Sequence, residues 1–132
     1  MKALETALTA CAQSLGISLP DGALERFRTY YDFLEERNRV MDLTAVAGEE
    51  ETALRHFGDS LTPLLCEDLR DKRLLDVGSG AGFPGLPLLL AEPGLHLTLL
   101  DSLGKRIAFL QETCAALGLE RVEAVHARAE EF

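Results

Sequence analysis

Basic residues are scarce in this sequence, and their scarcity limits how the protein can contact nucleic acid. Only 13 of the 132 residues are Lys or Arg, against 22 Asp or Glu, which gives a formal net charge of −9. A protein that holds nucleic acid through bulk positive charge has the opposite balance. The composition therefore argues against that mode of binding, and it leaves room for a local basic patch.

Long hydrophobic runs are also missing. The longest apolar stretch, Leu86–Ala91, is interrupted by Pro87, and it falls far short of the ~20 residues that a membrane-spanning helix needs. The chain does not begin with a basic segment followed by an apolar one, so we expect no secretory signal. These absences argue against a membrane protein and a secreted one.

Cysteine is sparse and scattered. The three cysteines, Cys11, Cys66 and Cys114, are an odd number, and none belongs to a CxxC motif. This pattern argues against a disulfide framework and against a zinc site, and we expect no metal. Cysteines that fill the core of a protein in the reducing cytoplasm fit the pattern better.

The composition otherwise suits a soluble globular protein, with 47% hydrophobic and 27% charged residues. The length suits one domain, or a small helical unit joined to part of a second. Over residues 1–70 the apolar spacing predicts three helices. Gly16 is the expected end of the first helix, and three glutamates at 49–51 suit the first turn of the third. The apolar face expected for that third helix comprises Ala53, Leu54, Phe57, Leu61, Leu64 and Leu65.

The second helix is expected to begin after Asp21, with Leu24, Phe27, Tyr31 and Leu34 on its apolar face. Tyr30 and Tyr31 have two interpretations. They could stack on nucleic-acid bases, or they could pack between helices, which is the interpretation that we favour.

From residue 71 the pattern alternates between strand and helix. Strands are expected at 74–77, 96–101 and 122–125, and helices at 86–91 and 105–117. Alternation of this kind indicates parallel strands joined by right-handed crossovers. We therefore predict an α/β fold in which residues 71–132 form the first half of a Rossmann-like domain, preceded by a helical region over residues 1–70.

The segment 74–85 is the most informative about chemistry. A predicted strand runs through Asp76 into a turn containing Gly78, Gly80 and Gly82, and this turn opens a helix. Glycine allows a tight turn and the close approach of a ligand, and free amides at a helix start can bind a carboxylate or phosphate. Asp101 ends the next predicted strand, where a carboxylate can accept both hydrogen bonds from a ribose diol.

Two cofactors fit this pattern, and a glycine turn without a ligand is a third interpretation. Residues 80–85 match GxGxxG, with Asp101 about 20 residues further on, as in NAD-binding folds. The fuller pattern Asp-x-Gly-x-Gly-x-Gly at residues 76–82 is typical of S-adenosylmethionine sites. Because Asp76 suits a cationic cofactor better than a pyrophosphate, we favour S-adenosylmethionine.

Four segments together resemble one family: Arg55–Leu61, Leu75–Gly85, Leu99–Arg106 and Arg128–Glu131. In order and spacing they resemble the bacterial small-subunit ribosomal RNA guanine-N7 methyltransferases, also called glucose-inhibited division protein B, and the resemblance runs from about residue 24 to residue 132. It implies a cytoplasmic enzyme with a class I, Rossmann-like fold that uses S-adenosylmethionine to methylate one guanine of 16S rRNA in the small ribosomal subunit. It also implies that Gly78, Phe83, Ala129 and Glu130 contact the cofactor.

Guanine N7 carries no proton, so this reaction needs no general base and we expect no catalytic residue. The protein must align the nucleophile with the sulfonium methyl group and reach an unstacked base. On this basis we expect Asp76 under the glycine turn near the cationic end of the cofactor, and Asp101 at its ribose. Phe83 and Ala129 would pack around the cofactor, and Glu130 would accept a hydrogen bond from the adenine amino group.

Other residues have two interpretations each. His56 and Asp59 share a helix face, and the resemblance suggests that they help form the floor of the target-base pocket; a surface ion pair or a loop cap is the alternative. A set of basic residues could meet RNA phosphates, which needs only local positive charge; a solvated face with i,i+4 pairs is the alternative that we favour. This set comprises Arg37, Arg39, Arg55, Lys105 and Arg106.

The sequence departs from the family pattern in two ways. Asp42 stands where the family has Asn before Leu-Thr, and an acid there could weaken RNA contact or cap a turn. Family members also continue well past residue 132, so we expect a truncated chain that is weak or inactive alone. The alternatives are an inactive cofactor-binding or partner-binding fragment and a fragment of an NAD-dependent oxidoreductase.

Overall fold

The computed structural model describes residues 2–41, 43–44 and 48–132. Its first part is helical, as the apolar spacing predicted. The first helix ends where Gly16 adopts a left-handed φ of 72°, a conformation that glycine reaches without strain. Arg28 joins the elements of this part, because its guanidinium pairs with both Glu5 and Glu49. The helical elements are α1 (Ala3–Leu15), α2 (Ala23–Met41), α3 (Glu49–Glu51), η1 (Thr52–Gly58) and η2 (Thr62–Leu65).

The expected third helix is the main departure from the sequence prediction. It is divided into a short α-helix, a π-helical stretch at Thr52–Gly58 and a 3₁₀ turn at Thr62–Leu65. Two of the leucines predicted to face inward, Leu54 and Leu65, are 50% and 54% exposed. The physical reason is a change of phase, because i→i+5 bonding takes more residues per turn than the 3.6-residue pattern assumes.

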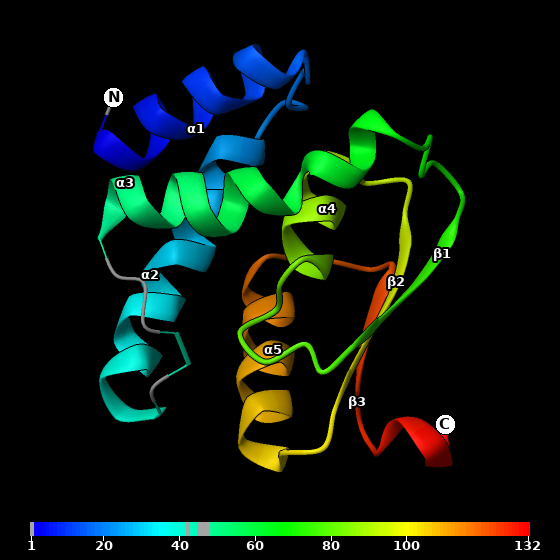
Figure 1. Ribbon diagram of the computed structural model, residues 1–132. Coiled ribbons are helices and arrows are strands. Elements are labelled where there is room, and N and C mark those ends of the chain that lie inside the picture. The colour runs from blue at the N-terminus through cyan, green and yellow to red at the C-terminus, as the bar shows by residue number, and fades with distance from the viewer. Residues whose placement is uncertain (1, 42, 45–47) are drawn as a thin grey trace.

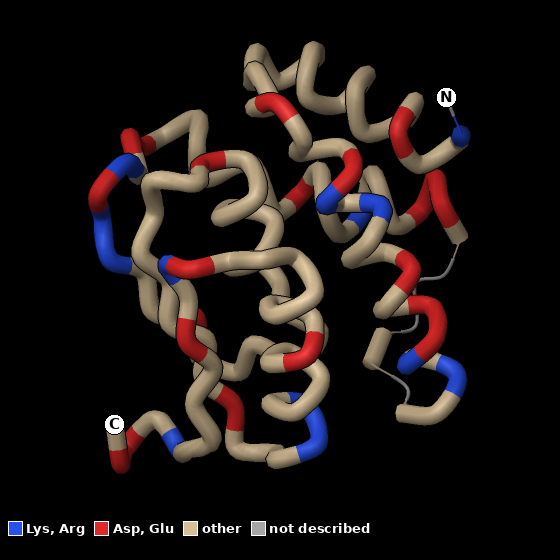
Figure 2. The backbone as a smooth tube through the Cα atoms, turned by 180° about the vertical axis from the view of Figure 1, so that it is seen from behind, with Lys and Arg blue, Asp and Glu red and all other residues tan. Residues whose placement is uncertain are grey.

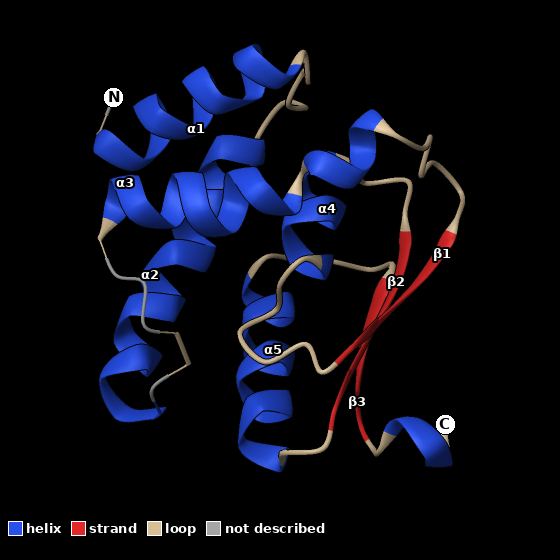
Figure 3. Ribbon diagram, viewed as in Figure 1, coloured by secondary structure: helices blue, strands red, loops and turns tan. Residues whose placement is uncertain are grey.

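Three parallel strands follow, in the order β1-β2-β3. Asp76 lies opposite Leu99 in the register, and Leu99 lies opposite Ala124. The sequence prediction of a parallel α/β arrangement is confirmed (Figure 3). The ends of the elements differ from the predicted ones by about one residue. The elements are β1 (Arg73–Val77), α4 (Gly85–Ala91), β2 (His96–Asp101), α5 (Gly104–Ala116), β3 (Val122–His126) and η3 (Ala129–Glu131).

The helices gather on one face of the sheet. α4 and α5 pack directly on the strands, and α2 packs on both of them as an outer layer (Figure 1). Side chains alternate along a strand, so Leu75 and Val77 point to the other face, where they are 45% and 54% exposed. The N-terminal helices therefore reach the sheet through α4 and α5.

An aromatic cluster fills the core between α2 and η1. Phe27, Tyr30 and Phe57 are fully buried, and the ring of Phe57 lies 5.0 Å from that of Phe27 and 5.3 Å from that of Tyr30. Tyr31 is also buried. The interpretation of both tyrosines as packing residues is confirmed, since buried rings are not free to stack on bases.

Candidate functional site

The carboxyl ends of the three strands define one side of the molecule. The turn after β1, the start of α5 and the C-terminal end of α2 all lie on this side, which is the lower one in Figure 1. Ligands of open parallel sheets bind in the crevice beyond the carboxyl ends of the strands. This side is therefore the candidate functional site.

The glycine turn after β1 has two kinds of glycine. Gly78, Gly80 and Gly82 all have positive φ values, of 73°, 57° and 103°. A Cβ at Gly78 would meet no atom within 4 Å, and one at Gly80 would meet only the Gly78 carbonyl oxygen at 3.9 Å. A Cβ at Gly82 would lie 2.5 Å from the hydroxyl oxygen of Tyr30. The first two glycines thus border open space, whereas Gly82 is required by packing.

Asp76 lies beneath the turn and is buried. Its Oδ2 accepts a 2.9 Å hydrogen bond from the amide of Gly85, at the start of α4, and its backbone carbonyl accepts one from the hydroxyl of Ser79. Burial raises the pKa of the Asp76 carboxyl, and the nearby charge of Asp101 adds to the rise. The hydrogen bond from Gly85 thus holds the carboxyl in place. Desolvation is the main cause of its raised pKa.

Asp101 connects the loops that follow β1 and β2. It is buried at the end of β2, where its Oδ2 accepts a 2.9 Å hydrogen bond from the amide of Gly80. Its Oδ1 accepts another, also of 2.9 Å, from the amide of Leu103. Each carboxylate oxygen can accept a second bond, so Asp101 retains capacity for ligand hydroxyls.

A hollow of about 400 Å³ opens beside Asp101, within the size range of small-molecule sites. The structure brings Gly78, Asp101, Ala129 and Glu130 together here from separate loops. Sequence reasoning did not assign Arg128, although it precedes Ala129 in one of the four family-like segments. The complete lining is Val77, Gly78, Leu100, Asp101, Ser102, Leu103, Ala127, Arg128, Ala129 and Glu130.

Phe83 lies on the side of the turn that faces the N-terminal helices. Its ring stacks on His56, with centroids 4.3 Å apart and planes 13° from parallel. The Nε2 atom of His56 lies 2.6 Å from the hydroxyl of Thr44. Burial lowers the pKa of His56, and the charge of Asp59 partly opposes this. An imidazole in this setting favours the neutral form at pH 7.

Four of the predicted basic residues lie at two ends of the same side, at the end of α2 and the start of α5 (Figure 2), whereas Arg55 lies in η1. Three of them are paired with acids in the structure. Arg37 pairs with Glu112 of α5, Arg55 with Glu51 one turn earlier at 3.6 Å, and Arg106 with Asp101 at 3.6 Å. Arg39 and Lys105 are exposed on α2 and α5. Asp42, the departure from the family pattern, lies outside the described residues.

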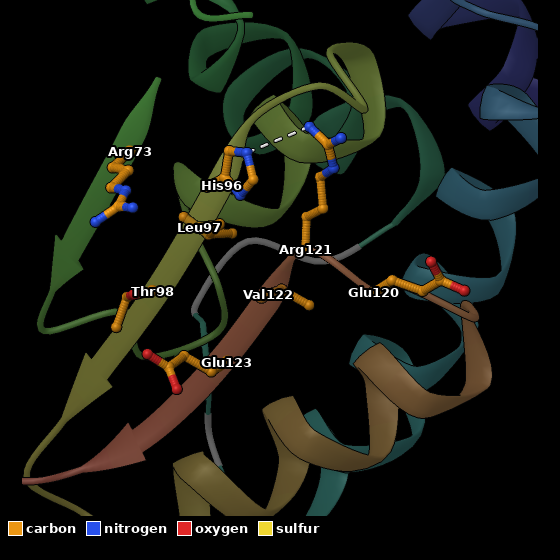
Figure 4. Close-up of a pocket in the computed structure, with 8 residues that line it drawn as sticks. All are labelled: Arg73, His96, Leu97, Thr98, Glu120, Arg121, Val122 and Glu123. Atoms are coloured by element: carbon orange, nitrogen blue, oxygen red, sulfur yellow. Dashed lines mark hydrogen bonds between the residues drawn. The ribbon is translucent and has the colours of Figure 1, made fainter. Parts of the chain in front are cut away.

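A second hollow, of about 430 Å³, lies at the amino ends of the strands, and Arg73, His96 and Arg121 are among the residues that line it (Figure 4). The Arg121 guanidinium is engaged there, with the Gly94 carbonyl at 3.0 Å and His96 Nε2 at 3.3 Å. This hollow is at the wrong end of a parallel sheet for a ligand held by the glycine turn.

Within residues 2–41, 43–44 and 48–132, no group of His, Cys, Asp and Glu side chains is placed to hold a metal ion. Along these ranges no helix combines the length and apolar character needed to span a bilayer.

Comparison with known proteins gives one consistent result. The sequence model of the family described as rRNA small subunit methyltransferase G matches residues 23–132. The ribosomal RNA small subunit methyltransferase G of Alkaliphilus oremlandii is 46% identical over 130 residues, which cover 98% of this chain and 54% of that protein. The protein of the same name from Pelotomaculum thermopropionicum is 42% identical over 132 residues, covering 99% and 55%. The chain thus spans about half the length of these curated relatives.

The fold is also similar to that of a solved methyltransferase structure. A putative protein-L-isoaspartate O-methyltransferase from Plasmodium falciparum, crystallised with S-adenosyl-L-homocysteine, superposes with a TM-score of 0.55 at 15% identity. The match covers 96% of this chain and 64% of that one. At this identity the likeness concerns the fold alone.

Proposed function

The chain belongs to the rRNA small subunit methyltransferase G family, and on that premise we propose that it serves S-adenosylmethionine-dependent methylation of a guanine N7 in 16S rRNA. The observation that carries the proposal is the placement of Asp101. Its carboxylate closes the glycine turn through Gly80 and lines the hollow at the carboxyl ends of the strands. The proposed setting is the bacterial cytoplasm, with 16S rRNA or the small ribosomal subunit as partner.

The residues around the hollow fit the adenosine part of this cofactor. Asp101 retains acceptor capacity for a ribose diol, and Glu130 would accept a hydrogen bond from the adenine amino group. Ala129 and the half-exposed Leu103 offer apolar surface for the base. Gly78 borders open space, where any side chain would enter the site.

The rest of the glycine turn would hold the other end of the cofactor. When bound, S-adenosylmethionine supplies an activated methyl group on a positively charged sulfur. Asp76 would contribute negative charge beneath that end, and Gly80 and Gly82 would shape the turn beside it. Phe83, stacked on His56, would border the cofactor site on the side of the N-terminal helices.

The target base would approach from the side of His56 and Asp59, and basic residues would meet the RNA phosphates. Of the predicted set, Arg39 and Lys105 are exposed at the two ends of this side, and Arg37, Arg55 and Arg106 would exchange an acidic partner for a phosphate. No side chain has to remove a proton, because N7 has a free lone pair. Alignment of the reactants is therefore the protein's main contribution.

Calorimetric titration of the purified chain tests the cofactor assignment. We expect S-adenosylhomocysteine to bind and NADH, the control ligand, not to bind. Binding of NADH alone would indicate an oxidoreductase fragment. Binding of neither ligand by a chain shown to be folded would favour an inactive fragment and overturn the proposal for these 132 residues.

A further inference from the structure

Tyr30 is a buried residue of α2 whose hydroxyl reaches the glycine turn. Its side chain has no exposed surface, and its hydroxyl donates a 2.5 Å hydrogen bond to the backbone carbonyl of Ala81, 51 residues further along the chain. Ala81 is itself buried, between Gly80 and Gly82. A helix of the N-terminal region thus contacts the middle of the turn.

The shape of the turn matches this contact. Gly82 has a φ of 103°, and a Cβ there would lie 2.5 Å from the Tyr30 hydroxyl oxygen, 2.9 Å from Leu86 and 3.1 Å from Leu110. The glycine therefore allows the backbone to close onto the phenol. Two residues earlier, the amide of Gly80 in the same turn donates a hydrogen bond to the carboxylate of Asp101.

Packing holds the phenol ring in place. The ring of Tyr30 stacks on Phe57 at 5.3 Å and lies 5.8 Å from Phe83, so it is held between the N-terminal helices and the turn. Phenylalanine would fill the same space without the cost of burying a hydroxyl. The hydrogen bond to the Ala81 carbonyl is the interaction that tyrosine makes and phenylalanine could not make.

We propose that Tyr30 is a positioning residue, which holds the glycine turn in the shape that binds the cofactor and so makes the N-terminal helices part of the cofactor site. The inference rests on the proposed function, because it assumes that the turn contacts S-adenosylmethionine. Tyr30 itself is buried and touches neither substrate nor cofactor. Its effect is transmitted through Ala81 and Gly82.

A pair of matched substitutions tests the proposal. Tyr30→Phe deletes one buried hydroxyl bonded to a backbone carbonyl. Thr113→Val deletes another, since the buried Thr113 hydroxyl donates a 2.8 Å bond to the Phe109 carbonyl within α5. We expect similar falls in the denaturation midpoint for the two variants. Only Tyr30→Phe should weaken S-adenosylhomocysteine binding, by about tenfold for one lost bond.

Amide hydrogen exchange in the ligand-free chain provides a second measurement. The amides of Gly80 and Gly82 are bonded to Asp101 and to the Ser79 carbonyl, and we expect Tyr30→Phe to speed their exchange while Thr113→Val leaves it unchanged. Parental exchange rates and affinity in Tyr30→Phe, or equal loosening in both variants, would overturn the proposal. Exchange is measured without ligand, so a parent chain that binds no cofactor would refute the proposed function and still leave the positioning role testable.

Discussion

The backbone amide of Gly80 donates a 2.9 Å hydrogen bond to Oδ2 of Asp101, across 21 residues of sequence. The other carboxylate oxygen accepts a bond from the amide of Leu103. One side chain therefore orders the loops after β1 and β2, on the two sides of the proposed ribose position. A change at Asp101 is expected to affect both the turn and the ligand.

Asp101→Asn should weaken S-adenosylhomocysteine binding at least about tenfold, because an amide has one acceptor oxygen where the carboxylate has two. Calorimetric titration measures the change. Asp68→Asn is the control, since Asp68 pairs with Arg70 at an exposed position away from the turn. Unchanged affinity in Asp101→Asn would refute the ribose assignment.

Gly82→Ala should destabilise the chain more than Gly118→Ala. Both glycines have positive φ values, 103° and 65°, so both substitutions strain the backbone, at a cost of about 1–2 kcal/mol. Only at Gly82 would the new methyl group collide with Tyr30, which adds about 1–3 kcal/mol. Urea denaturation measures both losses, and equal losses would contradict the packing explanation for Gly82.

Asp76 should make a pH-dependent contribution to stability. Burial, assisted by the charge of Asp101, raises the pKa of its carboxyl above the unfolded value of 3.8. The stabilising contribution of Asp76 is thus fully present at pH values below its unfolded pKa, and it is lost as the pH rises through its pKa in the folded protein. The free energy of unfolding of Asp76→Asn relative to the parent should therefore increase with pH above about 4.

Glu5→Gln is the matched comparison for this pH series. The hydrogen bond from Arg28 lowers the pKa of Glu5 below 4.5, so its contribution is present above the unfolded pKa and is lost as the pH falls through the folded one. Relative to the parent, Glu5→Gln should thus lose stability as the pH rises. If the stability of the two variants relative to the parent changed with pH in the same direction, the opposite pKa shifts of Asp76 and Glu5 would be contradicted. Denaturation midpoints across the acidic range provide the measurement.

The sheet face opposite α4 and α5 should promote self-association. Leu75 and Val77 are half exposed on β1, next to each other on that face, and exposed apolar patches on strands favour association. The double change Leu75→Thr with Val77→Thr should lower the apparent mass in light scattering at high concentration. Val40→Thr, on the exposed end of α2, serves as the control and should have no effect.

Local patterns determined most of the elements. Alternating apolar runs with glycine ends predicted the three strands and the helices between them, because those signals come from neighbouring residues. The sequence likewise predicted that the glycine turn and the two acids at strand ends lie near one another, because parallel strands bring their carboxyl ends to one edge. The same local reasoning was wrong at Leu54, in the π-helical stretch, and at Leu65, in the 3₁₀ turn that follows, because the apolar phase of a regular α-helix is lost there.

By itself, the sequence thus determined the α/β class, the parallel arrangement of the strands and the edge at which a ligand would lie. Only the tertiary structure decided what each glycine and acid does there. Gly82 leaves room for the Tyr30 hydroxyl, Asp101 accepts a hydrogen bond from the Gly80 amide, and Phe83 stacks on His56. These contacts join residues 21 or more positions apart. No periodic pattern encodes such pairs, because they depend on how α2 packs over the sheet and on the volume that each side chain occupies.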